Sequence, residues 1–178
     1  MQPERVIILI DGSNFYFKLR DIDLHRLPFD FGAFCRLLAG KNTLVRCVYH
    51  VGEVRTDGTE KSQQLYNKQQ KLMAQLRKHG VYYQFGYLLK SKGAYHEKGV
   101  DVHLAVDMLV AAYENLCERI ILVSSDSDLT PAIVKAQEKG KIVEYVGFSH
   151  KISLALARTC QDTRLLKKDD LLPLVQAA

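Results

Sequence analysis

The stretch IILVSSDSD, residues 120–128, decides the fold class that the sequence predicts. Its four apolar residues, three of them β-branched, indicate a short strand buried on both faces, which is typical of a parallel sheet. Pro131 then suits the first turn of a following helix. Ligands of open α/β sheets bind outside the carboxyl ends of the strands, so Asp126 and Asp128 lie where chemistry is expected. Two carboxylates there are unfavourable unless a cation or a proton neutralises them.

The same arrangement occurs near the start of the chain. Residues 5–10 (RVIILI) predict a second buried strand, which ends at Asp11-Gly12-Ser13-Asn14 and is followed by a helix through Phe15 and Leu19. Asp11 therefore occupies the carboxyl end of a strand, as Asp126 does. The alternative is that Asp11 or Ser13 only caps the helix, since both residue types are favoured there.

Strands and helices alternate along the rest of the chain. Further strands are expected at 44–51, 81–88 and 141–146, and helices at 31–38, 62–79, 131–139 and from Ser149 to about 160. This alternation predicts an α/β protein, a three-layer α/β/α sandwich with a mainly parallel central sheet. At 178 residues the chain is expected to form a single domain, 1–178, with 149–178 as its C-terminal helical part.

Composition points to an ordinary soluble protein. Hydrophobic residues make up 47% and charged residues 25% of the chain, and no apolar run approaches the roughly 20 residues that span a bilayer, so no membrane association is expected. Residues 1–5 lead straight into the first strand, which argues against a signal peptide. The four scattered cysteines fit reduced core thiols of a cytoplasmic protein. The net charge of +5 is compatible with a polyanionic substrate.

The most apolar helix is expected to open at Gly99-Val100-Asp101 and run to about 116. Every residue of 104–112 except Asp107 is apolar, so this helix should be largely buried. Asp101 falls at the helix N-terminus on its inward side, where the helix dipole favours a carboxylate. Asp107 needs a partner in such surroundings, and a hydrogen bond to the 124–125 turn is expected rather than direct binding of an ion. Before this helix, residues 89–99 read as a basic loop that could hold phosphates or simply lie at the surface.

Three acids from different segments, Asp11, Asp101 and Asp126, are thus predicted at one edge of the sheet, with Asp128 as a fourth candidate for catalysis. Carboxylates without a nearby Cys or His pair suit Mg²⁺ or Mn²⁺ rather than zinc, so the first three are expected to bind such an ion. A divalent ion there would activate a water molecule for attack on a phosphate. The expected substrate-binding residues are Ser13, Asn14, Lys98 and Ser125.

These motifs carry a resemblance to a known family. The segments 11–14 (DGSN), 98–102 (KGVDV) and 123–128 (VSSDSD), in this order and at strand ends, are similar to the NYN domain family, the LabA-like branch of the PIN-like nuclease superfamily. The similarity extends over about residues 6–147. It implies a PIN-like fold and a metal-dependent endoribonuclease site.

The resemblance places the family's acids on Asp11, Asp101 and Asp126. The accompanying polar positions fall on Asn14, Asp107 and Asp128. The sequence departs from the family in having serine at 125, where glycine is frequent, and leucine at 129, where an aromatic residue is common. Neither departure removes a charge.

Two other functions are compatible with parts of the sequence. The segment 126–130 (DSDLT) also matches the D-x-D-x-T motif of haloacid-dehalogenase-like phosphatases, but that motif follows the first strand, and too few residues remain here for the rest of that core. A non-catalytic RNA-binding or regulatory module with a vestigial acidic site is the second alternative. A serine nucleophile elbow and the glycine-rich nucleotide loops are absent from the sequence. The sequence favours hydrolysis of single-stranded or flexible RNA, and leaves open whether the chain forms a homo-oligomer.

Overall fold

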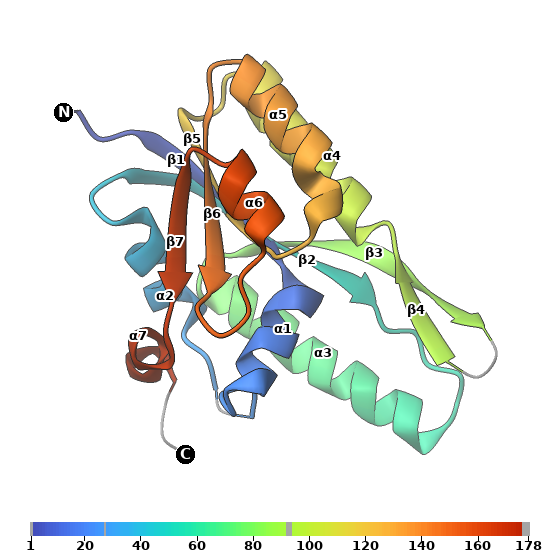
Figure 1. Ribbon diagram of the computed structural model, residues 1–178. Coiled ribbons are helices and arrows are strands. Elements are labelled where there is room, and N and C mark those ends of the chain that lie inside the picture. Colours follow the sequence, from blue (N-terminus) through green and yellow to red (C-terminus); the bar gives the residue numbers. More distant parts are fainter. Residues whose placement is uncertain (1, 27, 92–93, 176–178) are drawn as a thin grey trace.

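The computed structural model describes residues 2–26, 28–91 and 94–175, and for 88–91 and 94–97 the backbone alone. One twisted sheet runs through the molecule in the order β4-β3-β2-β1-β5-β6-β7 (Figure 1). Six of these strands are parallel, and β4 pairs antiparallel with β3 at one edge. The strands are β1 (Arg5–Asp11), β2 (Thr43–Glu53), β3 (Tyr82–Ser91), β4 (Ala94–Lys98), β5 (Arg119–Val123), β6 (Ile142–Phe148) and β7 (Asp162–Leu166).

Helices cover both faces of the sheet (Figure 1). On one face lie α1 (Gly12–Asp21), α2 (Phe31–Ala39), α3 (Glu60–Lys78) and α7 (Lys168–Leu171). On the other lie α4 (Val100–Tyr113), α5 (Thr130–Glu138) and α6 (Leu154–Thr159). Short 3-10 turns, η1 (Ser127–Leu129) and η2 (Leu172–Leu174), precede α5 and follow α7. The expected three-layer α/β/α sandwich is confirmed.

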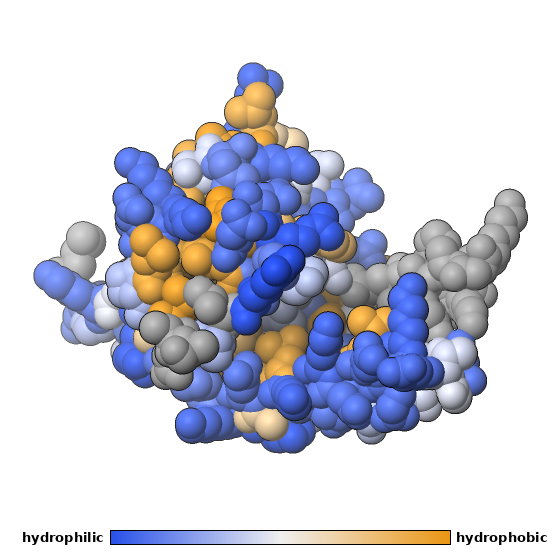
Figure 2. All heavy atoms as spheres, turned by 90° about the horizontal axis from the view of Figure 1, so that it is seen from below, coloured by the Kyte–Doolittle hydropathy of each residue, from blue (hydrophilic) through white to orange (hydrophobic). Residues whose placement is uncertain are grey.

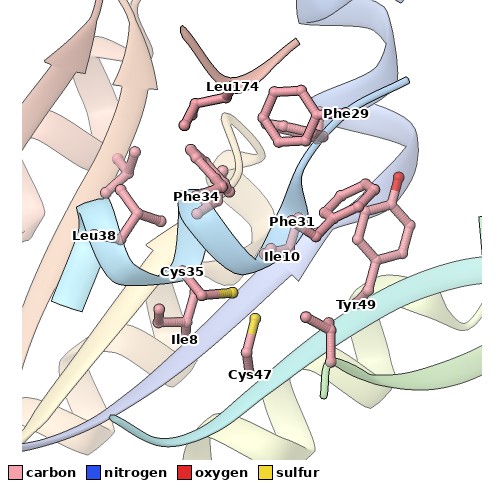
Figure 3. Packing of buried hydrophobic residues seen from close by; sticks show 14 of the residues in the cluster. Ile8, Ile10, Phe29, Phe31, Phe34, Cys35, Leu38, Cys47, Tyr49 and Leu174 are labelled. Atoms are coloured by element: carbon pink, nitrogen blue, oxygen red, sulfur yellow. The ribbon is translucent and has the colours of Figure 1, made fainter. Parts of the chain in front are cut away.

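Alternating side chains of the central strands fill two cores. In β1, Ile8 and Ile10 point toward the α1, α2 and α3 face, and Ile7 and Leu9 point toward α4 and α5. Phe29, Phe31 and Phe34 gather in the first core (Figure 3). The same core contains Cys35 and Cys47, whose sulfur atoms point toward each other. All four cysteines, Cys35, Cys47, Cys117 and Cys160, are buried free thiols.

Three expectations about the elements were wrong. Most of the described residues of the expected basic loop instead belong to β3 and β4, which pair antiparallel. Apart from Lys98, the basic side chains of this segment lie outside the described residues. The C-terminal part contains a strand, β7, besides its helices. Ser149 does not cap a helix, because its N–H donates to the carbonyl of Leu166 and continues the β6–β7 pairing; α6 begins five residues later.

The apolar helix α4 is buried on one side only. Leu104, Met108 and Ala112 pack on the sheet, but Val102 and Val106 remain 60% and 49% exposed. The expectation that this helix is largely buried therefore holds for its inner face alone. Among the described residues, no helix combines the length and apolarity needed to cross a membrane.

Candidate active site

Asp11 is the last residue of β1 and is held on both carboxylate oxygens. Its Oδ1 accepts a hydrogen bond from the backbone N–H of Asn14 at 3.0 Å, and its Oδ2 accepts one from the Ser124 hydroxyl at 2.9 Å. Asp11 thus caps α1, as the simpler reading of the sequence proposed, but it also faces the end of β5. Capping and a role in the site are compatible here.

The turn after Asp11 depends on a glycine. A Cβ atom on Gly12 would lie 2.3 Å from Cε1 of Tyr49 and 2.7 Å from the carbonyl oxygen of His50, distances that no side chain tolerates. The Tyr49 hydroxyl donates to the Gly12 carbonyl at 3.1 Å. The close approach of β2 therefore fixes where Asp11 projects from the sheet.

Ser124 links the two strand ends. Its side chain is buried, its hydroxyl donates to Asp11, and the same oxygen accepts a hydrogen bond from the N–H of Asp126 at 3.1 Å. Asp126 in turn accepts from the N–H of Asp128 at 2.9 Å and caps the short turn η1. The hydroxyl of Ser125 is buried and finds no hydrogen-bond partner among the described residues.

The three predicted acids meet in one cleft of about 230 Å³, lined by Asp11, Val100, Asp101 and Asp126. Asp101 reaches it from the first turn of α4, which starts after Gly99 in a left-handed conformation (φ 79°). The chain moves from β1 to β2 and β3 on one side and from β5 to β6 and β7 on the other, so the cleft lies at the point where the strand order reverses. In doubly wound sheets this crevice is the usual ligand site.

The NYN domain profile matches residues 5–166. The chain belongs to the NYN domain family. This family is part of the PIN-like superfamily and its members are typically nucleases, so at family level the activity is that of a nuclease-type hydrolase acting on RNA.

The structural comparison supports the same fold. A crystal structure of a protein of unknown function from Vibrio parahaemolyticus RIMD 2210633 is similar, with a TM-score of 0.73 and 24% sequence identity. The match covers 97% of this chain and 100% of that one. At this identity the likeness concerns the fold. No functionally curated protein matches the chain.

The carboxylates of this NYN domain suit a hard cation. Within the described part of the chain, no lysine or arginine forms an ion pair with Asp101 or Asp126. No three His, Cys, Asp or Glu side chains among the described residues approach closely enough to enclose an ion together. Mg²⁺ does not require such a cage, because it keeps several waters and binds through one or two carboxylates and the substrate's phosphates. The carboxylate oxygens that line the cleft fit an ion of this kind.

The remaining predicted residues lie around the cleft rather than in its lining. Asn14 contributes its backbone N–H to Asp11, and Ser13 is half-buried in the first turn of α1. Asp128 is exposed and binds Asp126 through its backbone. Lys98 is exposed at the end of β4. Roles for these four in catalysis or substrate binding stay predictions.

The hydrogen bond that the sequence predicted between Asp107 and the 124–125 turn is replaced by a contact with His50. Oδ2 of Asp107 lies 2.9 Å from Nε2 of His50, a fully buried residue near the carboxyl end of β2. The other ring nitrogen, Nδ1, is buried and has no hydrogen-bond partner within the part of the chain that the structure describes. Since His50 pairs in register with Asp11, this contact joins α4 to the strand beside the cleft. The sequence reading missed His50, although a histidine near the end of an otherwise apolar strand was a usable signal.

Proposed function

We propose that this NYN domain is a metal-dependent endoribonuclease that hydrolyses phosphodiester bonds of single-stranded or flexible RNA. The observation that carries the proposal is the single cleft at the reversal of strand order, into which three carboxylates project from β1, α4 and the turn after β5. A pocket with this charge attracts a divalent cation, and a divalent cation in turn attracts a phosphate.

Asp11, Asp101 and Asp126 would hold Mg²⁺ or Mn²⁺ in this site, in part through water molecules that the ion keeps. When bound, the cation lowers the pKa of an attacking water and offsets the negative charge on the leaving oxygen. Ser124 holds the carboxylate of Asp11 and the backbone of Asp126 in a fixed relation, so the two strand ends cannot move independently. Asp101 is exposed at the rim and is the member of the three most open to substrate. Such prior positioning of charge supplies much of the rate of phosphoryl chemistry.

RNA in unpaired form fits the site better than a duplex. The cleft is an open hollow at one edge of the sheet, and an unpaired strand can bring a single phosphate into it with its bases turned aside. The net charge of +5, with three acids confined to the cleft, leaves the rest of the surface still more basic, which favours a polyanion.

The alternative is an RNA-binding module without catalysis. The observation that favours it is that, among the described residues, no three acidic, histidine or cysteine side chains lie close enough to enclose an ion together. Dependence on a metal separates the two functions, because binding alone persists in EDTA and weakens as salt is raised.

The test is an RNA cleavage assay in which Mg²⁺ or Mn²⁺ is titrated into metal-free protein. Wild type is expected to cleave with saturable metal dependence, and Asp126→Asn to lose cleavage while keeping its circular dichroism spectrum. Asp169→Asn, which removes an exposed carboxylate from α7, is the matched control and should cleave normally. Equal cleavage by wild type and Asp126→Asn would contradict the proposal that this cleft is the ribonuclease site.

A further inference from the structure

The exposed face of α1 carries two aromatic rings and an arginine. Tyr16 and Phe17 are 46% and 48% exposed, and their ring centroids lie 5.7 Å apart, edge to face. The guanidinium of Arg20 lies 4.7 Å above the Phe17 ring, and the ring of His25 lies 5.7 Å from Tyr16. We call Tyr16, Phe17 and Arg20 the α1 platform.

These rings do not belong to the core of the protein. The inner face of α1 is already occupied by Phe15 and Leu19, which are 2% and 5% exposed. The outer face of a surface helix normally carries polar residues. Two adjacent aromatic side chains that remain about half exposed are therefore not required by the core. Clustered exposed apolar surface of this kind is typical of interaction sites.

The platform lies beside the acidic cleft. Ser13, Tyr16, Phe17 and Arg20 have the spacing i, i+3, i+4, i+7 and share one face of the helix. Ser13 is two residues from Asp11, and Phe17 lies roughly 9 Å from Asp11 along the helix axis at 1.5 Å per residue. From its start at the end of β1, α1 runs toward the lower side of Figure 1; seen from that side, hydrophobic residues lie at the surface among hydrophilic ones (Figure 2). A strand with one phosphate in the cleft would extend its neighbouring nucleotides over this face.

We propose that the α1 platform stacks the unpaired bases of single-stranded RNA next to the phosphodiester held in the cleft. The proposal rests on the proposed function, because it concerns the substrate of the same site. Sequence-tolerant binding of single strands combines aromatic faces with cations, and the platform offers both. Every base has a π face, and Arg20 adds a charge for a neighbouring phosphate. A duplex, whose bases already stack on one another, has no face to offer.

The test measures binding without cleavage. Fluorescence anisotropy in EDTA compares a labelled oligoadenylate with an abasic strand of equal length, using wild type, the double variant Tyr16→Ala/Phe17→Ala and the variant Phe17→Trp. The double variant should bind oligoadenylate about 5- to 150-fold more weakly, the range measured for the loss of one stacked base, and should bind the abasic strand as wild type does. Phe17→Trp keeps a stacking ring and should bind oligoadenylate at least as tightly as wild type.

Tyr82→Ala is a matched control. Tyr82 is 58% exposed and lies under the guanidinium of Arg46 at 4.7 Å, the same pairing as in the platform, but at the amino end of β3, away from the cleft. Its removal should leave oligoadenylate binding unchanged. Thermal unfolding of every variant checks that the fold is retained.

Several results would overturn the proposal. Equal losses on oligoadenylate and the abasic strand, or equal losses in the double variant and Tyr82→Ala, would show that the rings do not stack bases at the cleft. A change in oligomeric state of the double variant on size-exclusion chromatography, with RNA binding intact, would assign the surface to a protein contact. If the double variant binds and cleaves RNA normally, and cleavage by wild type requires metal, the stacking role of the α1 platform is wrong and the nuclease function is retained. If wild type neither binds nor cleaves RNA, both fail.

Discussion

Replacing Asp126 by asparagine should make the protein more stable in metal-free buffer, because the cleft brings its charge close to two other carboxylates. Asp126 shares the cleft with Asp11 and Asp101. Asparagine has nearly the same shape, and its side-chain oxygen can still accept the hydrogen bond from the N–H of Asp128, which is 2.9 Å from Asp126 Oδ1. The substitution therefore removes a charge and little else.

The size of the effect follows from the volume of the cleft. A sphere of 230 Å³ is roughly 8 Å across, and two unit charges at that separation repel by roughly 0.5 kcal/mol in bulk water and about 2 kcal/mol at an effective dielectric constant of about 20. The substitution removes two such repulsions, but exposure of Asp101 and screening by salt place them near the lower value. The neutral hydrogen bond to Asp128 is weaker by up to about 1 kcal/mol. A net gain of up to about 1 kcal/mol remains, which raises Tm by up to about 4 °C for a chain of this size.

Calorimetric unfolding of wild type and Asp126→Asn in EDTA at low ionic strength measures this gain. At high salt the difference in Tm should be smaller, because salt screens the repulsion. Asp169→Asn is the control for loss of a carboxylate outside the cleft and should leave Tm within about 1 °C of wild type, as is usual for surface changes. Adding Mg²⁺ should raise Tm of wild type more than Tm of Asp126→Asn. A lower Tm of Asp126→Asn in EDTA would refute the reasoning, since the carboxylate would then stabilise the fold by itself.

Three further predictions concern the scaffold. Gly12→Ala should lower the free energy of unfolding by about 1–3 kcal/mol in urea, and weaken cleavage by shifting the preceding carboxylate, because its Cβ meets the Tyr49 ring at 2.3 Å; unchanged stability would contradict this. Phe34→Ala should cost about 3–5 kcal/mol in the same measurement, since the ring is fully buried among other aromatic rings, and a loss under about 1 kcal/mol would show that the core collapses around the gap. The hydrogen bonds from Arg5 lower the pKa of Glu118 from 4.5 to about 2, so the stability they contribute is present above pH 4.5 and is lost as the pH falls toward 2. Between these pH values Glu118→Gln should lose less stability than wild type. Urea unfolding of both proteins across this range measures the loss, and an equal or larger loss in the variant would contradict the expectation.

The central strands were predictable because burial on both faces leaves a continuous apolar run. β1 and β5 are such runs, and their predicted bounds agree with the structure to within one residue at each end. The two strands that the sequence did not reveal lie at the edges of the sheet. In β7 only Leu166 is buried, so its sequence shows neither a run nor an alternation. β4 belongs to a hairpin of polar and aromatic residues, a composition equally typical of a surface loop.

Topology alone predicts that the three acids come together, but it does not predict the contacts that depend on side-chain geometry. That Asp11, Asp101 and Asp126 line one cleft follows from parallel strands ending at a common edge, which the apolar runs already imply. The pairing of Asp107 depends instead on which residue of β2 lies beside Asp11, and that register is fixed by backbone pairing between strands about 40 residues apart. The register places His50 beside Asp11, and the side chain of His50, buried on the α4 face, contacts Asp107. A sequence motif therefore predicts which charges converge, whereas the identity of their nearest neighbours requires the sheet register.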